Sequence, residues 1–77
     1  MVNIALLNAE MEDLGISKAV LARKCNFTRI TLYNKLGNPK SITADDAYRI
    51  ADALRIPRGS QKFLDIFFAP EVSETET

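Results

Sequence analysis

Apolar residues recur every three or four positions along this chain, in stretches separated by turn-forming residues. This spacing is that of one face of an α-helix. The first stretch runs from Val2 to Leu14, with its apolar face at Ile4, Leu7, Met11 and Leu14. Gly15 then supplies the left-handed conformation that ends many helices. We expect this helix to cover the next two from behind.

A second, shorter helix is predicted after Ser17, which is a good N-cap residue. Its apolar face consists of Leu21, Ala22 and Cys25. Asn26 tolerates the left-handed conformation better than most residues other than glycine, so we expect the helix to end there.

Thr28 caps a third helix, in which only Leu32 and Leu36 share a clear apolar face before Gly37 offers a stop. The second and third helices are about two turns long and are joined by a short turn, so they must pack at a steep angle. On a helical wheel, the residues opposite or beside that apolar face are Arg29, Ile30, Tyr33 and Asn34. We expect these four side chains to lack a core to enter and to face a partner.

Residues 17 to 36 resemble the helix-turn-helix of the lambda-repressor-like, Cro-type (XRE-like) DNA-binding domains. The positions that carry the resemblance are Leu21, Ala22, Cys25, Phe27 and Leu32. The family often has Gln at the position of Lys18 and Gly at that of Asn26. The resemblance implies an all-α, compact five-helix domain, with helices 2 and 3 as the helix-turn-helix.

Two more helices follow a turn at residues 38 to 41. Thr43 caps the fourth, whose first turn holds Asp45 and Asp46 and whose narrow apolar stripe is Ala47, Ile50, Ala51 and Leu54. Arg49 and Asp52 are expected in water, and Tyr48 as a half-buried packing residue. The segment before Pro57 is expected to break this helix.

The fifth helix is predicted from about Ser60 to Ala69, closed by Pro70, and it is apolar on most of its circumference. One interpretation places Phe63, Leu64 and Phe67 in the core. Another assigns the surplus to an interface with a second subunit, with Ile66, Phe67 and Phe68 as candidates. Residues 1 to 69 are therefore expected to form one small domain that dimerises, and the acidic tail 70 to 77 to be disordered.

The formal net charge is zero, but the charges are not evenly distributed. Residues 17 to 40 contain six basic residues and no acid: Lys18, Arg23, Lys24, Arg29, Lys35 and Lys40. We expect the acids to lie away from this basic motif, which favours contact with nucleic acid.

The chain has no histidine, a single cysteine and no glycine-rich phosphate loop, so we expect neither an enzyme nor a metal site. No cofactor or small-molecule ligand is expected. Without a signal pattern or a long apolar run, we expect a cytoplasmic protein that does not enter a membrane. Cys25 is interpreted as a small core residue.

The resemblance implies a transcriptional regulator of Cro or repressor type, from a phage or prophage, that binds a double-stranded DNA operator as a homodimer. The base-contacting residues would be Arg29, Ile30, Tyr33 and Asn34, with ordinary surface packing as the alternative for Ile30 and Tyr33. The phosphate-contacting residues would be Lys18, Thr28 and Lys40. The alternative function is a protein-interaction module of antirepressor or antitoxin type that uses the apolar fifth helix.

Overall fold

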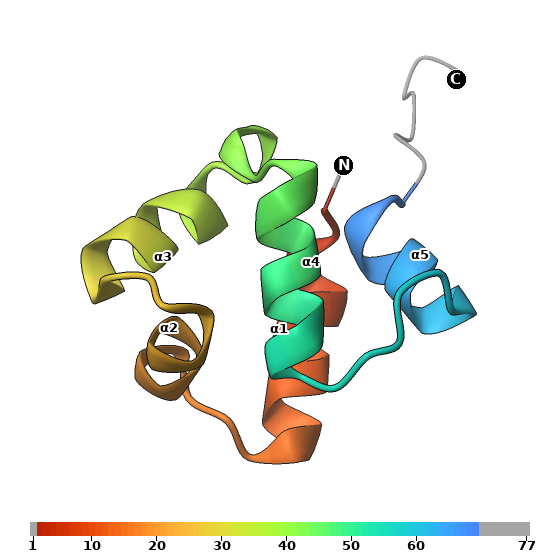
Figure 1. Ribbon diagram of the computed structural model, residues 1–77, viewed down its shortest axis with the longest axis horizontal. Helices are drawn as coiled ribbons and strands as arrows, with labels where there is room; N and C mark the ends of the chain where they lie inside the picture. Colours follow the sequence, from red (N-terminus) through yellow and green to blue (C-terminus); the bar gives the residue numbers. More distant parts are fainter. Residues whose placement is uncertain (1, 70–77) are drawn as a thin grey trace.

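Five α-helices and one short 3₁₀ helix make up residues 2–69, the part of the chain that the computed structural model describes (Figure 1). In chain order they are α1 (Ile4–Leu14), α2 (Lys18–Cys25), α3 (Arg29–Gly37), η1 (Pro39–Ser41), α4 (Ala44–Ala53) and α5 (Gln61–Phe67). No strand occurs within residues 2–69, so the all-α class is confirmed there. The predicted acidic tail, and Pro70 with it, lies outside the described residues.

Each α-helix begins at a polar side chain that accepts a hydrogen bond from a backbone N–H three residues further on. These N-caps are Asn3, Ser17, Thr28, Thr43 and Ser60. The capping roles predicted for Ser17, Thr28 and Thr43 are confirmed. The first helix begins at Ile4 and not at Val2, because Asn3 is its N-cap. The backbone N–H of Asn3 donates to the Ile66 carbonyl at 2.6 Å.

Three helices end at a residue with left-handed backbone, namely Gly15, Asn26 and Arg55. After each, the next backbone N–H returns to a carbonyl five residues back, as in Ile16 to Met11, Phe27 to Ala22 and Ile56 to Ala51, all at 2.9 Å. The ends at Gly15 and Asn26 are as predicted. α4 ends before the segment that precedes Pro57, as predicted, and the left-handed residue at this end is Arg55, with φ 59°. Gly37 is the last residue of α3, without a positive φ.

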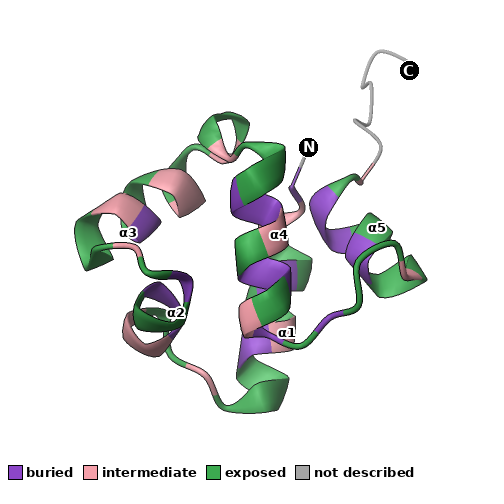
Figure 2. Cartoon of the chain, viewed as in Figure 1, coloured by how far each residue is buried: buried purple, intermediate pink, exposed green. Residues whose placement is uncertain are grey.

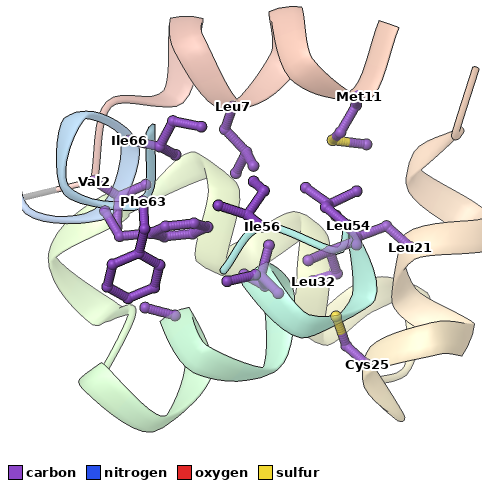
Figure 3. Packing of buried hydrophobic residues seen from close by; sticks show 14 of the residues in the cluster. Val2, Leu7, Met11, Leu21, Cys25, Leu32, Leu54, Ile56, Phe63 and Ile66 are labelled. Carbon is purple, nitrogen blue, oxygen red and sulfur yellow. The ribbon is translucent and has the colours of Figure 1, made fainter. Parts of the chain in front are cut away.

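One hydrophobic cluster joins all five helices. α4 lies at the centre, with the α2–α3 pair on one side and α5 on the other (Figure 1). Figure 3 shows Leu7 and Met11 of α1 pointing into this cluster, toward Ile56 and Leu54. α1 packs most closely against α5, and α4 packs against α2. α1 also borders α2 and α3, with which it lines a surface cleft, so the expectation that it covers the helix-turn-helix from behind holds only in part.

Buried residues follow the predicted faces of α2 and α4 closely. In α2 they are Leu21, Ala22 and Cys25, and in α4 they include the whole predicted stripe of Ala47, Ile50 and Ala51, with Leu54 directly after the helix. Tyr48 is half-buried as predicted, with its ring stacked on Phe63 at 5.7 Å between centroids. Leu14, predicted on the apolar face of α1, is exposed at the end of that helix.

The orientation of α5 agrees with each sequence-based interpretation only in part. Phe63 and Phe67 are buried, as the core interpretation predicts. The buried residues of α5 also include Ile66, whereas Leu64, which we expected in the core, is exposed. Ile66 and Phe67 were candidates for a dimer interface, but they are only 3% and 2% exposed and pack inside the monomer. Phe68 is 47% exposed and stays accessible. The helix ends at Phe67 and not at Ala69.

Within residues 2–69, none of the helices has the length and apolar character required to cross a membrane.

Candidate nucleic-acid interface

α3 is held to the molecule by one face and leaves the other open. Leu32 is completely buried and Leu36 is partly buried against the cluster. The opposite side of the helix therefore faces solvent at the edge of the molecule, on the far side of α4 from α5 (Figure 2). There Ile30 is 72% exposed and Tyr33 is 48% exposed. Arg29 and Asn34 are exposed as well, so the structure leaves all four predicted base-contacting side chains open to water.

Five cations of the basic motif are exposed to solvent. Lys18 and Arg29 are the first residues of α2 and α3, and Lys40 lies in η1, directly after α3. Arg23 and Lys24 are exposed on α2. None of these five side chains has an ion pair with another residue in the range 2–69. Five positive charges of the basic motif are therefore not neutralised by the described part of the fold.

Lys35 is the exception among the motif cations. Its ammonium lies 2.8 Å from the Asp46 carboxylate at the start of α4. The expectation that every acid lies away from the motif is therefore wrong at this position. The ion pair neutralises one cation of the basic motif and connects the C-terminal half of α3 with the N-terminus of α4.

Asp46 is the buried charged residue at this junction, only 8% exposed. Its carboxylate also accepts the Thr43 backbone N–H at 3.1 Å, while the Thr43 hydroxyl accepts the Asp46 N–H at 3.1 Å, which is a capping box. Burial disfavours the charged carboxylate, but the hydrogen bonds from Lys35 and Thr43 outweigh that effect and lower the pKa of Asp46 below its ordinary value. Asp46 is therefore ionised at neutral pH and holds α3 in place.

Phe27, in the turn between α2 and α3, is packed beneath the same junction. The Lys35 ammonium and the Arg49 guanidinium each lie 5.8 Å from its ring centroid. Two cations on one ring add further attraction between the turn, α3 and α4. The position of α3 therefore depends on Leu32, on the Lys35–Asp46 pair and on Phe27.

Thr28 is exposed, but its hydroxyl already has partners. Its Oγ1 accepts the Thr31 backbone N–H at 3.0 Å and donates to the Thr31 Oγ1 at 2.8 Å. To donate a hydrogen bond to a phosphate, the Thr28 hydroxyl would have to rotate away from the Thr31 Oγ1.

A surface cleft of about 250 Å³ opens where α1, α2 and α3 meet. It is lined by Ile4, Asn8, Lys18, Tyr33, Leu36 and Gly37. The Lys18 ammonium lies 5.8 Å from the centroid of the Tyr33 ring, so two of the predicted contact residues converge here. The sequence pattern did not indicate Asn8, because it stands on a different helix and α1 carries no motif.

The described residues contain no group of three or more cysteine, aspartate or glutamate side chains placed to hold a metal ion. Cys25 is buried, as expected of a core residue, and its thiol contacts the Arg49 carbonyl at 3.8 Å. Burial raises the pKa of this thiol to about 11, so it stays protonated at neutral pH.

Comparison with models of known protein families, with curated proteins and with solved structures found no match to this chain.

Proposed function

We propose that this chain is a sequence-specific DNA-binding transcriptional regulator of the lambda-repressor-like, Cro-type family, acting in the cytoplasm. In this proposal α2 and α3 are the helix-turn-helix, and α3 enters the major groove of a duplex operator. The observation that carries the proposal is the open face of α3, where a cationic, an apolar, an aromatic and an amide side chain stand together in water beside unpaired cations.

The charge at the helix ends supports a polyanionic partner. α2 and α3 begin with Lys18 and Arg29 and have no acid in the first turn, whereas the first turn of α4 holds Asp45 and Asp46. A cation at the positive end of a helix dipole is unfavourable by about 0.3–1 kcal/mol. A phosphate placed near these residues would offset that cost. The cations at the starts of α2 and α3 are thus more favourable when a phosphate is bound than in the free protein.

Each side chain on the open face has a base edge that it fits chemically. Arg29 can donate two hydrogen bonds to guanine, and Ile30 can contact a thymine methyl group. Asn34 can donate to and accept from adenine, or donate to a phosphate. Tyr33 is assigned to a base or to the sugar-phosphate chain. Lys18 and Lys40 are assigned to phosphates, with Thr28 as a third contact if its hydroxyl turns away from Thr31.

A homodimer is part of the proposal. Leu64 on α5 and Phe68 directly after it are exposed and four positions apart, and α5 lies on the far side of α4 from α3 (Figure 1). Burying such a pair against a second copy would remove apolar area from water. Dimers of this class place two recognition helices about 34 Å apart, one helical turn of DNA.

Selection from a random duplex library, followed by fluorescence anisotropy, tests the proposal. Arg29→Ala should weaken binding to the preferred site by roughly 1 to 3 kcal/mol and relax the choice of base at one position. Lys18→Ala should weaken preferred and random duplexes alike. If the wild-type chain binds no duplex, or if neither substitution changes affinity, the proposal is wrong.

The second candidate is a protein-interaction module on the same scaffold, and the exposure of Leu64 and Phe68 favours it. Salt dependence separates the two functions. DNA binding should weaken steeply as salt rises, because counterions released from DNA drive it. Association through Leu64 and Phe68 should be unchanged or strengthened by salt.

A further inference from the structure

We infer that Asn8, Lys18 and Tyr33 form a binding site for one backbone phosphate of DNA, which makes α1 a third DNA-contacting helix. The inference rests on the proposed function, because the phosphate belongs to the duplex that α3 reads. It adds Asn8, a residue outside the helix-turn-helix.

The site is the cleft of about 250 Å³ between α1, α2 and α3, to which each helix contributes one polar side chain. Lys18 and Asn8 also line a second surface cleft of about 360 Å³ along α1, so both stand at the boundary between the two hollows. The Tyr33 ring lies beneath the Lys18 ammonium at 5.8 Å. This contact restrains a long, flexible side chain at the mouth of the cleft.

The groups in the cleft match a phosphodiester. Lys18 has no ion pair within residues 2–69, and no carboxylate lines this cleft, although Glu12 lines the second cleft that Lys18 and Asn8 share. The exposed Asn8 amide has no hydrogen-bond partner among the described residues, so its two N–H donors are free for a phosphate oxygen. Ile4 and Leu36 provide apolar walls for the attached sugar. One cation and one neutral donor suit a group that carries a single negative charge.

The position of Tyr33 connects this phosphate to a duplex. Tyr33 lines the cleft and also belongs to the open face of α3. If the bases of a DNA strand contact Arg29 and Ile30, the backbone of that DNA strand would therefore pass the cleft as it leaves the major groove. The cleft is open to solvent, as a continuous polymer requires.

Two isosteric substitutions test the site. Asn8→Asp replaces an amide donor with a carboxylate next to the phosphate, and Gln61→Glu makes the same change on α5, on the other side of the molecule. Asn8→Asp should weaken binding about fivefold on preferred and random duplexes alike, because one repulsive charge pair is added at close range. Gln61→Glu should change affinity less than twofold. Asn8→Lys should steepen the salt dependence of log K by about 0.9 per log unit of salt, corresponding to one more phosphate contact.

Neutral methylphosphonate linkages, placed one at a time along the selected duplex, then locate the contact. At one linkage, wild-type protein and the Asn8→Asp variant should bind with the same affinity, because a neutral methylphosphonate does not repel the introduced carboxylate. If Asn8→Asp weakens binding no more than Gln61→Glu, while Arg29→Ala still does, this inference is wrong and the proposed function stands. If no variant affects binding because no duplex binds, both are wrong.

Discussion

The Lys35–Asp46 pair makes a quantitative prediction about how α3 is held. Asp46→Asn keeps the size of the side chain and an oxygen that can accept the Thr43 N–H, but it removes the charge that Lys35 contacts at 2.8 Å. Asp45→Asn is the matched control in the same turn. Asp45 is 78% exposed in its side chain and pairs with Arg49 at 3.5 Å.

The burial of the two pairs sets the expected magnitudes. Removing one partner of a fully buried pair costs about 3–5 kcal/mol. The side chains of Lys35 and Asp46 retain 21% and 12% of their exposure, so the freed ammonium regains some water. We therefore expect Asp46→Asn to lower the free energy of unfolding by about 2 kcal/mol, within the range for hydrogen bonds to charged groups. Asp45→Asn should cost about 0.5 kcal/mol or less.

The same pair should produce a pH dependence with a definite sign. The pKa of Asp46 in the folded chain lies below its ordinary value of 3.8, so the folded state loses a proton more readily than the unfolded state. The stabilisation is complete above about pH 5 and disappears as pH falls through the folded pKa. The stability gap between wild type and Asp46→Asn should therefore be full at pH 7 and shrink below pH 3.8.

Urea unfolding followed by circular dichroism at several pH values measures both effects. If Asp46→Asn costs no more than Asp45→Asn at pH 7, Asp46 does not anchor α3. A gap that stays constant down to pH 3 or lower would show that the charge of Asp46 is not the cause.

The packing leads to three further predictions, two for substitutions and one for a thiol reaction. Leu32→Ala removes a completely buried side chain from α3 and should lower the free energy of unfolding by about 3 kcal/mol in the same urea assay; a loss below about 1 kcal/mol would contradict its role. Arg55→Gly should stabilise the chain by about 0.5–1 kcal/mol, because Arg55 has a φ of 59°, and a fall in Tm would contradict this. Cys25, with a buried thiol whose pKa is about 11, should react with a thiol reagent at pH 8 only as fast as the chain opens, and reaction at the rate of free cysteine would show that the thiol is accessible.

Local sequence signals predicted most helix boundaries. Serine and threonine caps and the left-handed positions at Gly15 and Asn26 act within a few residues, so their effect can be read from neighbouring positions. Arg55 escaped prediction because arginine has no preference for left-handed backbone. The left-handed conformation of Arg55 is followed directly by Ile56, whose side chain is buried in the hydrophobic cluster.

Features that depend on contacts between distant helices were not predictable in the same way. The fifth helix is apolar on most sides, so periodicity could not decide whether Leu64 or Ile66 faces the core. The exposed face of α3 was predictable because Leu32 and Leu36 define its inner side unambiguously. The pairing of Lys35 with Asp46, eleven positions away, has no signal in the sequence, and neither has the approach of Asn8 to Lys18.

The most direct test of the central claim, that the open face of α3 enters a DNA groove, is an NMR titration with isoleucine methyl groups labelled. Isoleucines occur in or near every helix, but Ile30 alone is placed on this face, and it is 72% exposed. On addition of the selected duplex, the Ile30 methyl should shift most and show contacts to thymine methyl or base protons. An Ile30 signal that stays unchanged while Ile66 of α5 shifts would contradict the proposal and favour a protein-interaction role.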